Sequence, residues 1–220
     1  KADAVATAPI NKESLIASGS EFIDHTEMYA RMTGRRAVTM FEVDLLRIFF
    51  LTRHVSLRRS LDMLTPGLVR EGIEFCQVNM KRLGFPRPRL AVAALNPHAS
   101  DGGLFGSEEA EILEPAIKAA RNSGVDIYGP VPADSVFYEA RKGRYDAVLS
   151  LYHDQGHIAA KTYDFERTVS VTLGLPFVRT SVDHGTAFNI AGKGVANATS
   201  MIEAILSAAR YALIWKRNTG

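Results

Sequence analysis

Histidines end three apolar, strand-like runs of the sequence, and imidazole is a common ligand of divalent metals. His54 follows residues 47–52, His98 follows residues 90–95, and His153 follows residues 147–151. In an open α/β sheet the carboxyl ends of parallel strands converge on one edge, where ligands bind. The three histidines lie 44 and 55 residues apart, too far for a finger or a single-helix motif. The sequence therefore predicts one metal site with three protein ligands and an open coordination position. The alternative is that His98 and His153 only begin turns.

The segment from Tyr152 to His157 places several polar groups on one predicted turn. Gly156 is expected to allow a sharp bend there. Asp154 has three open roles: it orients an imidazole, accepts a proton, or simply forms the turn.

Two cations are expected at the ends of secondary-structure elements. Lys161 follows the histidine segment, and Arg179 follows the apolar run 169–178. Either residue could hold a phosphate or a carboxylate, or remain an ordinary solvated charge. His25 and Thr26 are predicted at the substrate-facing start of a helix, although His25 could equally serve only as a neighbour of the helix cap.

The elements that must position these residues alternate between strand-like and helix-like patterns. Residues 4–7 read as a strand, and residues 56–70, 107–122 and 200–215 show the spacing of amphipathic helices. Strands joined by crossover helices favour parallel pairing, so we predict an α/β fold with a largely parallel sheet. We expect a metal- and substrate-binding region over residues 1–145, which includes the dimerisation part, and a cofactor-binding region over residues 146–220.

Bulk composition limits the classes of function. The chain has 220 residues, 46% of them hydrophobic, and a formal net charge of +2 with its basic residues dispersed. No basic tract indicates nucleic acid or an anionic membrane as a partner. The single cysteine, Cys76, excludes an intrachain disulfide and fits a reducing cytoplasm. No apolar run reaches the roughly 20 residues of a membrane span, so we expect a cytoplasmic protein. Because the chain opens almost directly on a strand, we also expect it to be the later portion of a longer protein.

Two glycine-rich loops could bind anions or nucleotides. Residues 101–106 precede a helix but lack the spacing of a P-loop or a Rossmann fingerprint. Residues 183–197 closely resemble the adenosine-binding loop of the isocitrate and isopropylmalate dehydrogenase superfamily, which binds NAD.

Segments spread over most of the chain together resemble the 4-hydroxythreonine-4-phosphate dehydrogenase family. The matching segments are TAPINK (7–12), DHTE (24–27), TRH (52–54), LNPH (95–98), GPVPAD (129–134), YHDQG (152–156) and LGLPFVRTSVDHGTA (173–187). The resemblance implies an isocitrate/isopropylmalate dehydrogenase-like fold that lacks roughly the first third of a family member.

The resemblance also implies roles for individual residues. The implied metal ligands are His54, His98 and His153. The implied substrate contacts are His25, Thr26, Lys161, Ser170 and Arg179. The candidate catalytic residues are Lys161, Asp154 and Asp134, the two aspartates for proton transfer. The implied cofactor contacts are His184, Gly185, Thr186, Ala187, Asn189 and Asn197.

The implied reaction is an oxidative decarboxylation of a phosphorylated β-hydroxy acid. NAD, or alternatively NADP, takes the hydride, and a divalent zinc, cobalt, manganese or magnesium ion binds the hydroxyl and carboxylate oxygens. The expected substrate is 4-hydroxythreonine 4-phosphate, used in pyridoxal 5'-phosphate biosynthesis, and the expected assembly is a homodimer with a shared active site.

Ser170 leaves other substrates open. The family usually has Asn at this position, and a hydroxyl cannot reproduce both donors and the acceptor of an amide. Enzymes for 4-phospho-D-threonate or 4-phospho-erythronate, or for a dihydrodiol dicarboxylate, are therefore alternatives. From other classes, a metal-dependent hydrolase and a non-catalytic binding protein stay open, but a hydrolase would not need the loop 183–197.

Overall fold

The computed structural model describes the backbone of residues 2–219 and the side chains of residues 2–215. It contains an eight-stranded, mostly parallel sheet flanked by helices, in the strand order β1-β8-β7-β2-β3-β6-β4-β5. The strands are β1 Ala4–Thr7, β2 Val38–Val43, β3 Leu46–Phe50, β4 Leu90–Ala93, β5 Ile127–Val131, β6 Ala147–Ser150, β7 Val169–Leu173 and β8 Val178–Val182. The predicted α/β class with a largely parallel sheet is confirmed.

The α-helices are α1 Lys12–Ala17, α2 His25–Thr33, α3 Leu57–Asp62, α4 Pro66–Arg82, α5 Glu114–Asn122, α6 Ala133–Arg141, α7 His153–Tyr163 and α8 Thr199–Thr219. Three short helical turns complete the fold: η1 Pro97–Asp101, η2 Glu109–Leu113 and η3 Phe188–Ile190. Within the described part of the chain, no helix is both long and apolar enough to cross a membrane.

The chain forms two compact units. One comprises the residues up to Met40 together with those from Asp164 onward, and the other runs from Phe41 to Tyr163. The chain leaves the first unit within β2 and returns to it directly after α7. The boundaries of these compact units differ from the boundary between the predicted regions 1–145 and 146–220. Those regions describe where metal, substrate and cofactor bind, and they stay a prediction.

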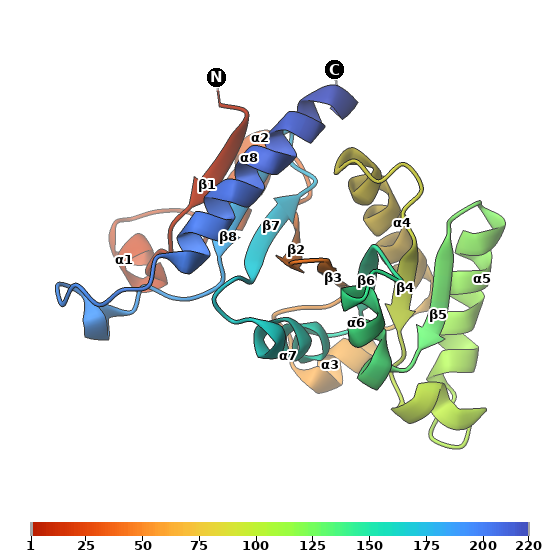
Figure 1. The fold of residues 1–220 in the computed structure, drawn as a ribbon. Coiled ribbons are helices and arrows are strands. Elements are labelled where there is room, and N and C mark those ends of the chain that lie inside the picture. Colours follow the sequence, from red (N-terminus) through yellow and green to blue (C-terminus); the bar gives the residue numbers. More distant parts are fainter. Residues whose placement is uncertain (1, 220) are drawn as a thin grey trace. The chain divides into compact units, whose positions relative to one another are not determined.

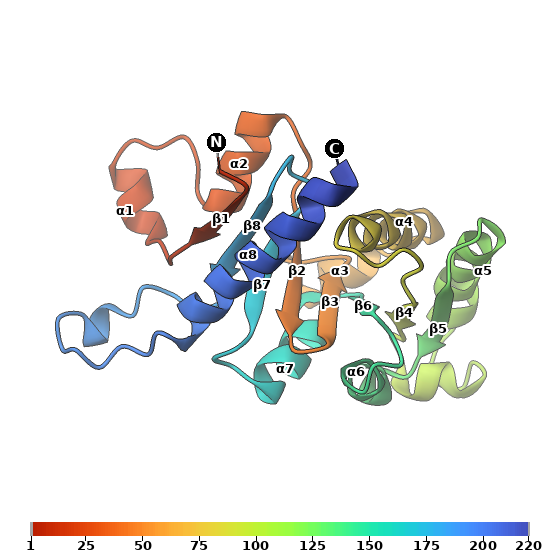
Figure 2. The ribbon, with the colours of Figure 1, turned by 45° about the horizontal axis from the view of Figure 1, so that its top comes forward.

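The unit from Phe41 to Tyr163 is built on parallel strands. β3 pairs with β6, β6 with β4, and β4 with β5, all in parallel. Figure 2 shows α4 and α5 on one face of these strands and α6 and α7 on the other. The core under α6 and α7 is formed by buried apolar side chains such as Ile48, Phe50 and Val148. Burial of this apolar surface fixes the strand ends that carry the histidines.

The predicted helix over residues 56–70 is in fact two helices. α3 ends at Asp62, and α4 begins at Pro66 after Thr65, whose side-chain oxygen accepts a hydrogen bond from the Leu68 amide. Proline is favoured in the first turn of a helix but lacks the amide proton needed further along one. The helical spacing of the leucines therefore continues from α3 into α4, although the Thr65 cap separates the two helices.

The other unit is built around β1, β7 and β8. β1 pairs with β8 in parallel, and β8 pairs with β7 antiparallel. Helix α8 packs across β1 and β8 (Figure 1). The apolar run 169–178 contains a tight connection between β7 and β8, where Gly174 adopts a φ of 89°. Arg179 therefore lies inside β8 and not at the end of one long strand, as the sequence had suggested.

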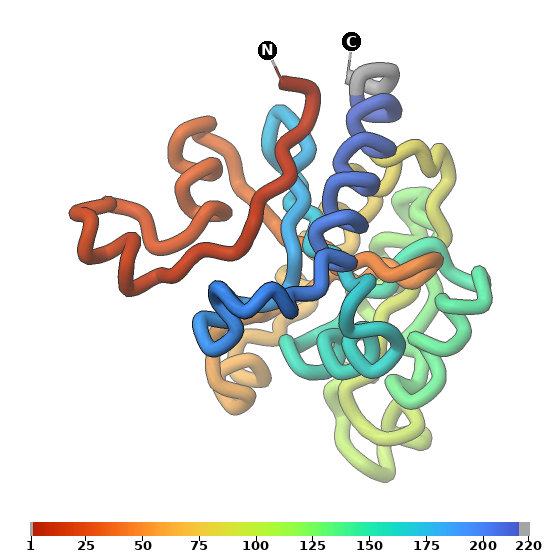
Figure 3. The backbone as a smooth tube through the Cα atoms, turned by 60° about the vertical axis from the view of Figure 1, so that its left-hand side comes forward, coloured from red at the N-terminus to blue at the C-terminus, as the bar shows by residue number. Residues whose placement is uncertain are grey.

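Two further segments of this unit position candidate site residues. α2 begins at His25 because Asp24 caps it, accepting a hydrogen bond from the Glu27 amide at 2.8 Å. This cap places His25 and Thr26 in the first turn of α2. The segment between β8 and α8, which carries the glycine-rich loop 183–197, projects as an extended excursion of the chain (Figure 3).

Candidate active site

The three predicted metal ligands follow three adjacent, parallel strands. His54 comes after β3, His153 after β6, and His98 after β4, and β6 pairs with both of the other strands. Parallel strands have their carboxyl ends at one edge of the sheet. The predicted topological relationship among the three positions is confirmed.

His54 and His153 come close together at this edge. Their ring centroids lie 6.0 Å apart. Two imidazoles that bind one metal through nitrogens at about 2.1 Å have ring centroids about 5 to 6 Å apart. The pair therefore fits two positions around a divalent ion, and neutral imidazole nitrogens are suitable donors for it.

The third predicted ligand, His98, lies on the turn η1. Its side chain is exposed, and its Nδ1 lies 3.4 Å from a carboxylate oxygen of Asp101. Among the side chains of residues 2–215, no group of three or more His, Cys, Asp or Glu residues is arranged to hold a metal. The structure thus brings two of the predicted ligands together but does not assemble the complete set.

His153 is held by neighbours on α7. Its Nδ1 lies 2.6 Å from Oδ1 of Asp154, and its ring stacks on that of His157 at a centroid distance of 3.6 Å. When Nδ1 carries the proton shared with Asp154, Nε2 presents its lone pair to a ligand. Among the roles left open for Asp154, this contact supports orientation of an imidazole.

His157 was not recognised from the sequence as a site residue. Its Nδ1 lies 2.8 Å from the backbone oxygen of His153, and its ring packs against Phe41 and Phe50. Burial, together with the nearby charges of His153 and Lys161, lowers the pKa of His157 to about 4. The signal available in the sequence was its spacing of four residues from His153, which puts both rings on one face of a helix.

Gly156 has a different role from the predicted one. His153 begins the regular helix α7, and Gly156 lies buried within that helix. A Cβ at this position would approach Ile48 and Phe50 side-chain carbons to 2.7 Å and the Ser150 hydroxyl to 2.8 Å. The glycine therefore permits α7 to lie directly on β3 and β6, and the prediction of a sharp bend was wrong.

In the unit that contains both termini, Arg179 is the centre of a polar cluster. It is buried, and it donates hydrogen bonds from Nε and Nη2 to Thr7 Oγ1 at 3.0 and 2.6 Å. Its Nη1 donates to Thr26 and Thr172 hydroxyls, both at 3.2 Å. Nδ1 of His25 lies 3.5 Å from Nη2. No carboxylate takes part in these contacts, so the guanidinium charge remains available to an anion.

The charges in this cluster influence one another. Burial lowers the pKa of His25, the positive charge of Arg179 lowers it further, and Asp24 acts in the opposite direction. Burial also lowers the pKa of Arg179 from its ordinary value. A buried cation without a paired carboxylate is unfavourable, and a bound phosphate or carboxylate group would relieve that cost.

The remaining predicted substrate and catalytic residues are distributed over both units. Ser170 is buried on β7 and lies opposite Ser181 of β8. Lys161 is half-buried in the last turn of α7, on the same helix face as His153. Asp134 is exposed in the first turn of α6.

The loop 183–197 forms a cavity of about 530 Å³ with the start of α8 and the residues before β7. Five of the six predicted cofactor residues line it: His184, Gly185, Thr186, Ala187 and Asn197. Asn189, the sixth, lies on η3 and is not among the lining residues. The cavity lies in the size range of small-molecule and cofactor pockets.

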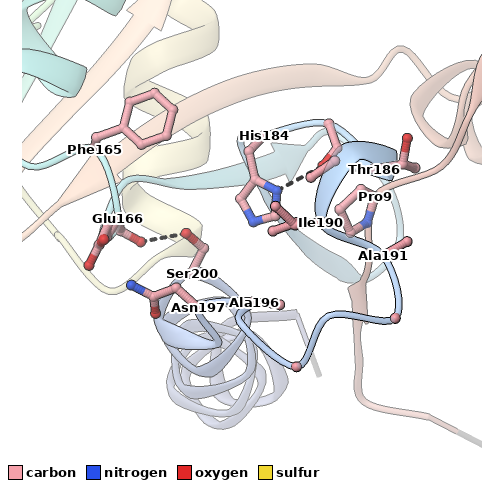
Figure 4. A pocket seen from close by; sticks show the side chains of 14 residues that line it. Pro9, Phe165, Glu166, His184, Thr186, Ile190, Ala191, Ala196, Asn197 and Ser200 are labelled. Atoms are coloured by element: carbon pink, nitrogen blue, oxygen red, sulfur yellow. Dashed lines mark hydrogen bonds between the residues drawn. The ribbon is translucent and has the colours of Figure 1, made fainter.

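The opposite side of this cavity was not predicted. Figure 4 shows Phe165 and Glu166 on that side, with Ser200 donating a hydrogen bond to the Glu166 backbone oxygen at 2.6 Å. These residues lie 17 and 18 positions before the glycine-rich loop, so the sequence offered no local signal for their contribution. The aromatic ring of Phe165 gives the cavity an apolar surface on which a planar ring could stack.

Comparison with known proteins supports the architecture. A curated protein from Fusobacterium nucleatum, named "Putative D-threonate 4-phosphate dehydrogenase", is 58% identical over 213 residues, which cover 96% of this chain and 64% of that protein. The crystal structure of 4-hydroxythreonine-4-phosphate dehydrogenase from Klebsiella pneumoniae has 45% identity and a TM-score of 0.87, covering 95% of this chain and 63% of that one. The chain thus spans less than two thirds of the length of these relatives.

A more distant likeness concerns the fold alone. Isocitrate dehydrogenase from Methylococcus capsulatus matches 98% of this chain and 70% of its own chain, with 16% identity and a TM-score of 0.55. The predicted isocitrate dehydrogenase-like fold is therefore confirmed. The model of one family, described as pyridoxal phosphate biosynthetic protein PdxA, matches residues 1–208. Because this match extends over most of the chain, the chain belongs to the PdxA family.

Proposed function

We propose that this chain is part of a dehydrogenase that uses NAD and a divalent metal to oxidise and decarboxylate a phosphorylated four-carbon hydroxy acid. D-threonate 4-phosphate is the leading substrate, because the relative with that name is 58% identical, whereas the 4-hydroxythreonine-4-phosphate dehydrogenase structure is 45% identical. The observation that carries the proposal is the buried Arg179, whose guanidinium donates its hydrogen bonds to threonine hydroxyls and not to a carboxylate.

Arg179 would bind an anionic group of the substrate. The hydroxyls of Thr7, Thr26 and Thr172 hold the guanidinium in one orientation, so its planar donors are pre-organised. His25, with its lowered pKa, is neutral in the free protein at pH 7, and a nearby anion would favour its protonated form. A phosphate monoester matches this combination of fixed and adjustable positive charge.

His54 and His153 would hold a divalent ion, and His98 is the proposed third ligand. When bound, such an ion would favour ionisation of the substrate alcohol and stabilise negative charge on oxygen during loss of carbon dioxide. Asp154 would keep the imidazole of His153 in the orientation that ligation requires. Because the chain resembles the members of this family, we also propose a homodimer in which both copies contribute residues to each active site.

Oxidation of the alcohol requires acceptors for a hydride and a proton. NAD, or alternatively NADP, would take the hydride from the substrate carbon, and the loop 183–197 would hold its adenosine part. Lys161 and the aspartates Asp154 and Asp134 are the proposed groups for moving the hydroxyl proton and for protonating the carbon that loses carbon dioxide. A metal-dependent hydrolase would not need the cavity formed by this loop, which favours the dehydrogenase.

Formation of reduced cofactor tests the reaction and the substrate together. The protein is supplied with NAD, zinc or cobalt, and either D-threonate 4-phosphate or 4-hydroxythreonine 4-phosphate, and absorbance of NADH is followed. We expect faster reduction with D-threonate 4-phosphate. The two compounds differ at the carbon next to the carboxylate, which bears a hydroxyl in one and an amine in the other. Faster formation of NADH with 4-hydroxythreonine 4-phosphate would reverse the substrate assignment. Consumption of either substrate without formation of NADH would contradict the proposed dehydrogenase activity.

Zinc content tests the metal ligands separately. After dialysis against zinc, we expect His153→Ala to retain much less metal than the unsubstituted chain, whereas His25→Gln, in the other unit, should retain as much. Equal metal content in His153→Ala would remove His153 from the ligand set.

A further inference from the structure

The turn that carries His98 has an unusual backbone. Four consecutive residues other than glycine have positive φ angles: 52° at His98, 56° at Ala99, 71° at Ser100 and 46° at Asp101. Left-handed backbone is disfavoured for L-residues, and it normally occurs at single positions. A run of four must therefore be held by its surroundings.

Glu109, on the following helical turn, supplies that support. Its side chain is 1% exposed. Oε1 accepts hydrogen bonds from the amides of Leu95 and Asn96, at 2.8 and 2.7 Å. Oε2 accepts from Asn96 Nδ2 at 2.8 Å and from the Ser100 hydroxyl at 2.6 Å. One carboxylate thus joins the entrance of the left-handed turn to its middle.

These contacts leave Glu109 no capacity for another role. A carboxylate has about four lone-pair positions, and four donors occupy them here. Burial alone would raise the pKa of Glu109, but the hydrogen bonds from Asn96 and Ser100 outweigh it and hold that pKa below its ordinary value. Glu109 is therefore neither a candidate proton acceptor nor a candidate metal ligand.

The orientation of His98 depends on the backbone of the turn. Its side chain is 64% exposed, and its ring lies beside two residues of the same turn and the segment after it, Asp101 at 3.4 Å and Phe105 at a ring-centroid distance of 6.5 Å. Neighbouring core side chains do not enclose it. The direction of its Cα–Cβ bond, set by the left-handed φ, consequently decides where the imidazole is presented.

We infer that Glu109 is a positioning residue, whose buried carboxylate fixes the left-handed turn and thereby the direction in which His98 is presented. The use of that imidazole as a metal ligand rests on the proposed function, whereas the control of its position does not.

Glu109→Gln tests this inference in the 220-residue chain. Glutamine keeps the size of the side chain, but its NH2 group would face groups that already donate hydrogen bonds to Glu109, such as Asn96 Nδ2 and the Ser100 hydroxyl. Glu111→Gln is the matched control, since Glu111 is exposed on the same turn. The measurements are hydrogen exchange at the Leu95 and Asn96 amides, the ¹⁵N-imidazole resonances of His98 without metal, and zinc titration of those resonances.

In Glu109→Gln we expect exchange at the two amides to rise on the order of tenfold, since each loses a charge-assisted hydrogen bond. The metal-free His98 resonances should shift or broaden while those of His153 stay in place, and zinc affinity should fall about 10- to 100-fold. Glu111→Gln should change none of these quantities. Faster amide exchange with unchanged His98 resonances would overturn the inference, because Glu109 would then be purely structural.

The two proposals fail in distinguishable ways. If zinc leaves His98 of the unsubstituted chain unperturbed, the metal role of His98 is contradicted, while the metal-free resonances still decide the role of Glu109. If Glu109→Gln does not fold, Ser100→Ala removes one of the four donors and is judged by the same resonances, with a shift of His98 supporting the inference and no shift overturning it.

Discussion

Arg179 and Thr7 form a paired contact across 172 residues of sequence. Both Nε and Nη2 of the guanidinium donate to the same Thr7 hydroxyl, at 3.0 and 2.6 Å. The contact is possible because β1 and β8 are parallel neighbours, with Val5 in register with Arg179. Two donors directed at one oxygen restrict rotation of the guanidinium plane, and this restriction prepares it for a planar or tetrahedral anion.

Replacement of Arg179 by lysine should weaken binding of the phosphorylated substrate. The ammonium keeps the charge but loses the planar set of donors, and hydrogen bonds to charged groups contribute about 1.5–3 kcal/mol, so affinity should fall about 10- to 100-fold. Calorimetric titration with D-threonate 4-phosphate measures the change. Arg31→Lys, at an exposed arginine of the same unit, is the control. Equal affinities for Arg179→Lys and the control would exclude Arg179 from the anion site.

Anion binding beside His25 should be accompanied by proton uptake. The pKa of His25 in the free protein lies below 6.5 because of burial and Arg179, and a bound anion would raise it. Since the bound state then holds more protons, affinity must increase as the pH falls through this range. Sulfate is a suitable probe, because it keeps its charge between pH 4 and 8. His25→Gln should show a flatter dependence, and an unchanged slope would contradict a role for this imidazole.

The same shift affects folding stability. Because the pKa of His25 is lowered in the folded state, the unfolded chain binds more protons below pH 6.5. The contribution of His25 to stability is therefore fully present above pH 6.5 and declines as the pH falls through the lowered folded-state pKa. Denaturant unfolding at pH 7.5 and 5 should show a smaller loss of stability for His25→Gln than for the unsubstituted chain.

Gly156→Ala should destabilise the protein by about 1–3 kcal/mol, the usual cost of overpacking a core. The added methyl group would meet Ile48, Phe50 and Ser150 within 2.8 Å. Gly67→Ala is the matched control in another helix, where the nearest atom to the new Cβ lies at 3.9 Å. Urea unfolding of both variants measures the difference. A loss no larger than that of the control would contradict the close packing of α7 on the sheet.

Ala196→Trp should block the cavity next to the glycine-rich loop. A large side chain there would occupy the space proposed for adenosine, so the NAD dissociation constant should rise on the order of tenfold or more while folding stability stays nearly unchanged. Val195→Trp places the same side chain at an exposed neighbour outside the lining residues. Fluorescence or calorimetric titration with NAD compares them, and similar losses in both variants would place the nucleotide elsewhere.

Local patterns in the sequence determined much of this protein. Apolar runs followed by His54, His98 and His153 predicted three strand ends on one edge, and these strands are indeed adjacent and parallel. Such predictions succeed because alternating strands and helices leave few ways to bury apolar surface in an α/β sheet. The loop 183–197 stands out in the sequence because its residues are contiguous, and most of its predicted contacts line one cavity, while its binding of NAD stays a prediction.

Only the tertiary structure decided which side chains meet. The sequence predicts a bend at Gly156, whereas its role depends on contacts with Ile48 and Phe50, which lie about a hundred residues earlier in the chain. The sequence places Arg179 at the end of a strand, but its hydrogen-bond partners include Thr7 and Thr26, which are more than 150 residues away in the sequence. The environments of His157 and Glu109 could likewise not be predicted from the sequence, because burial and hydrogen bonding depend on the packed chain and not on local residue spacing.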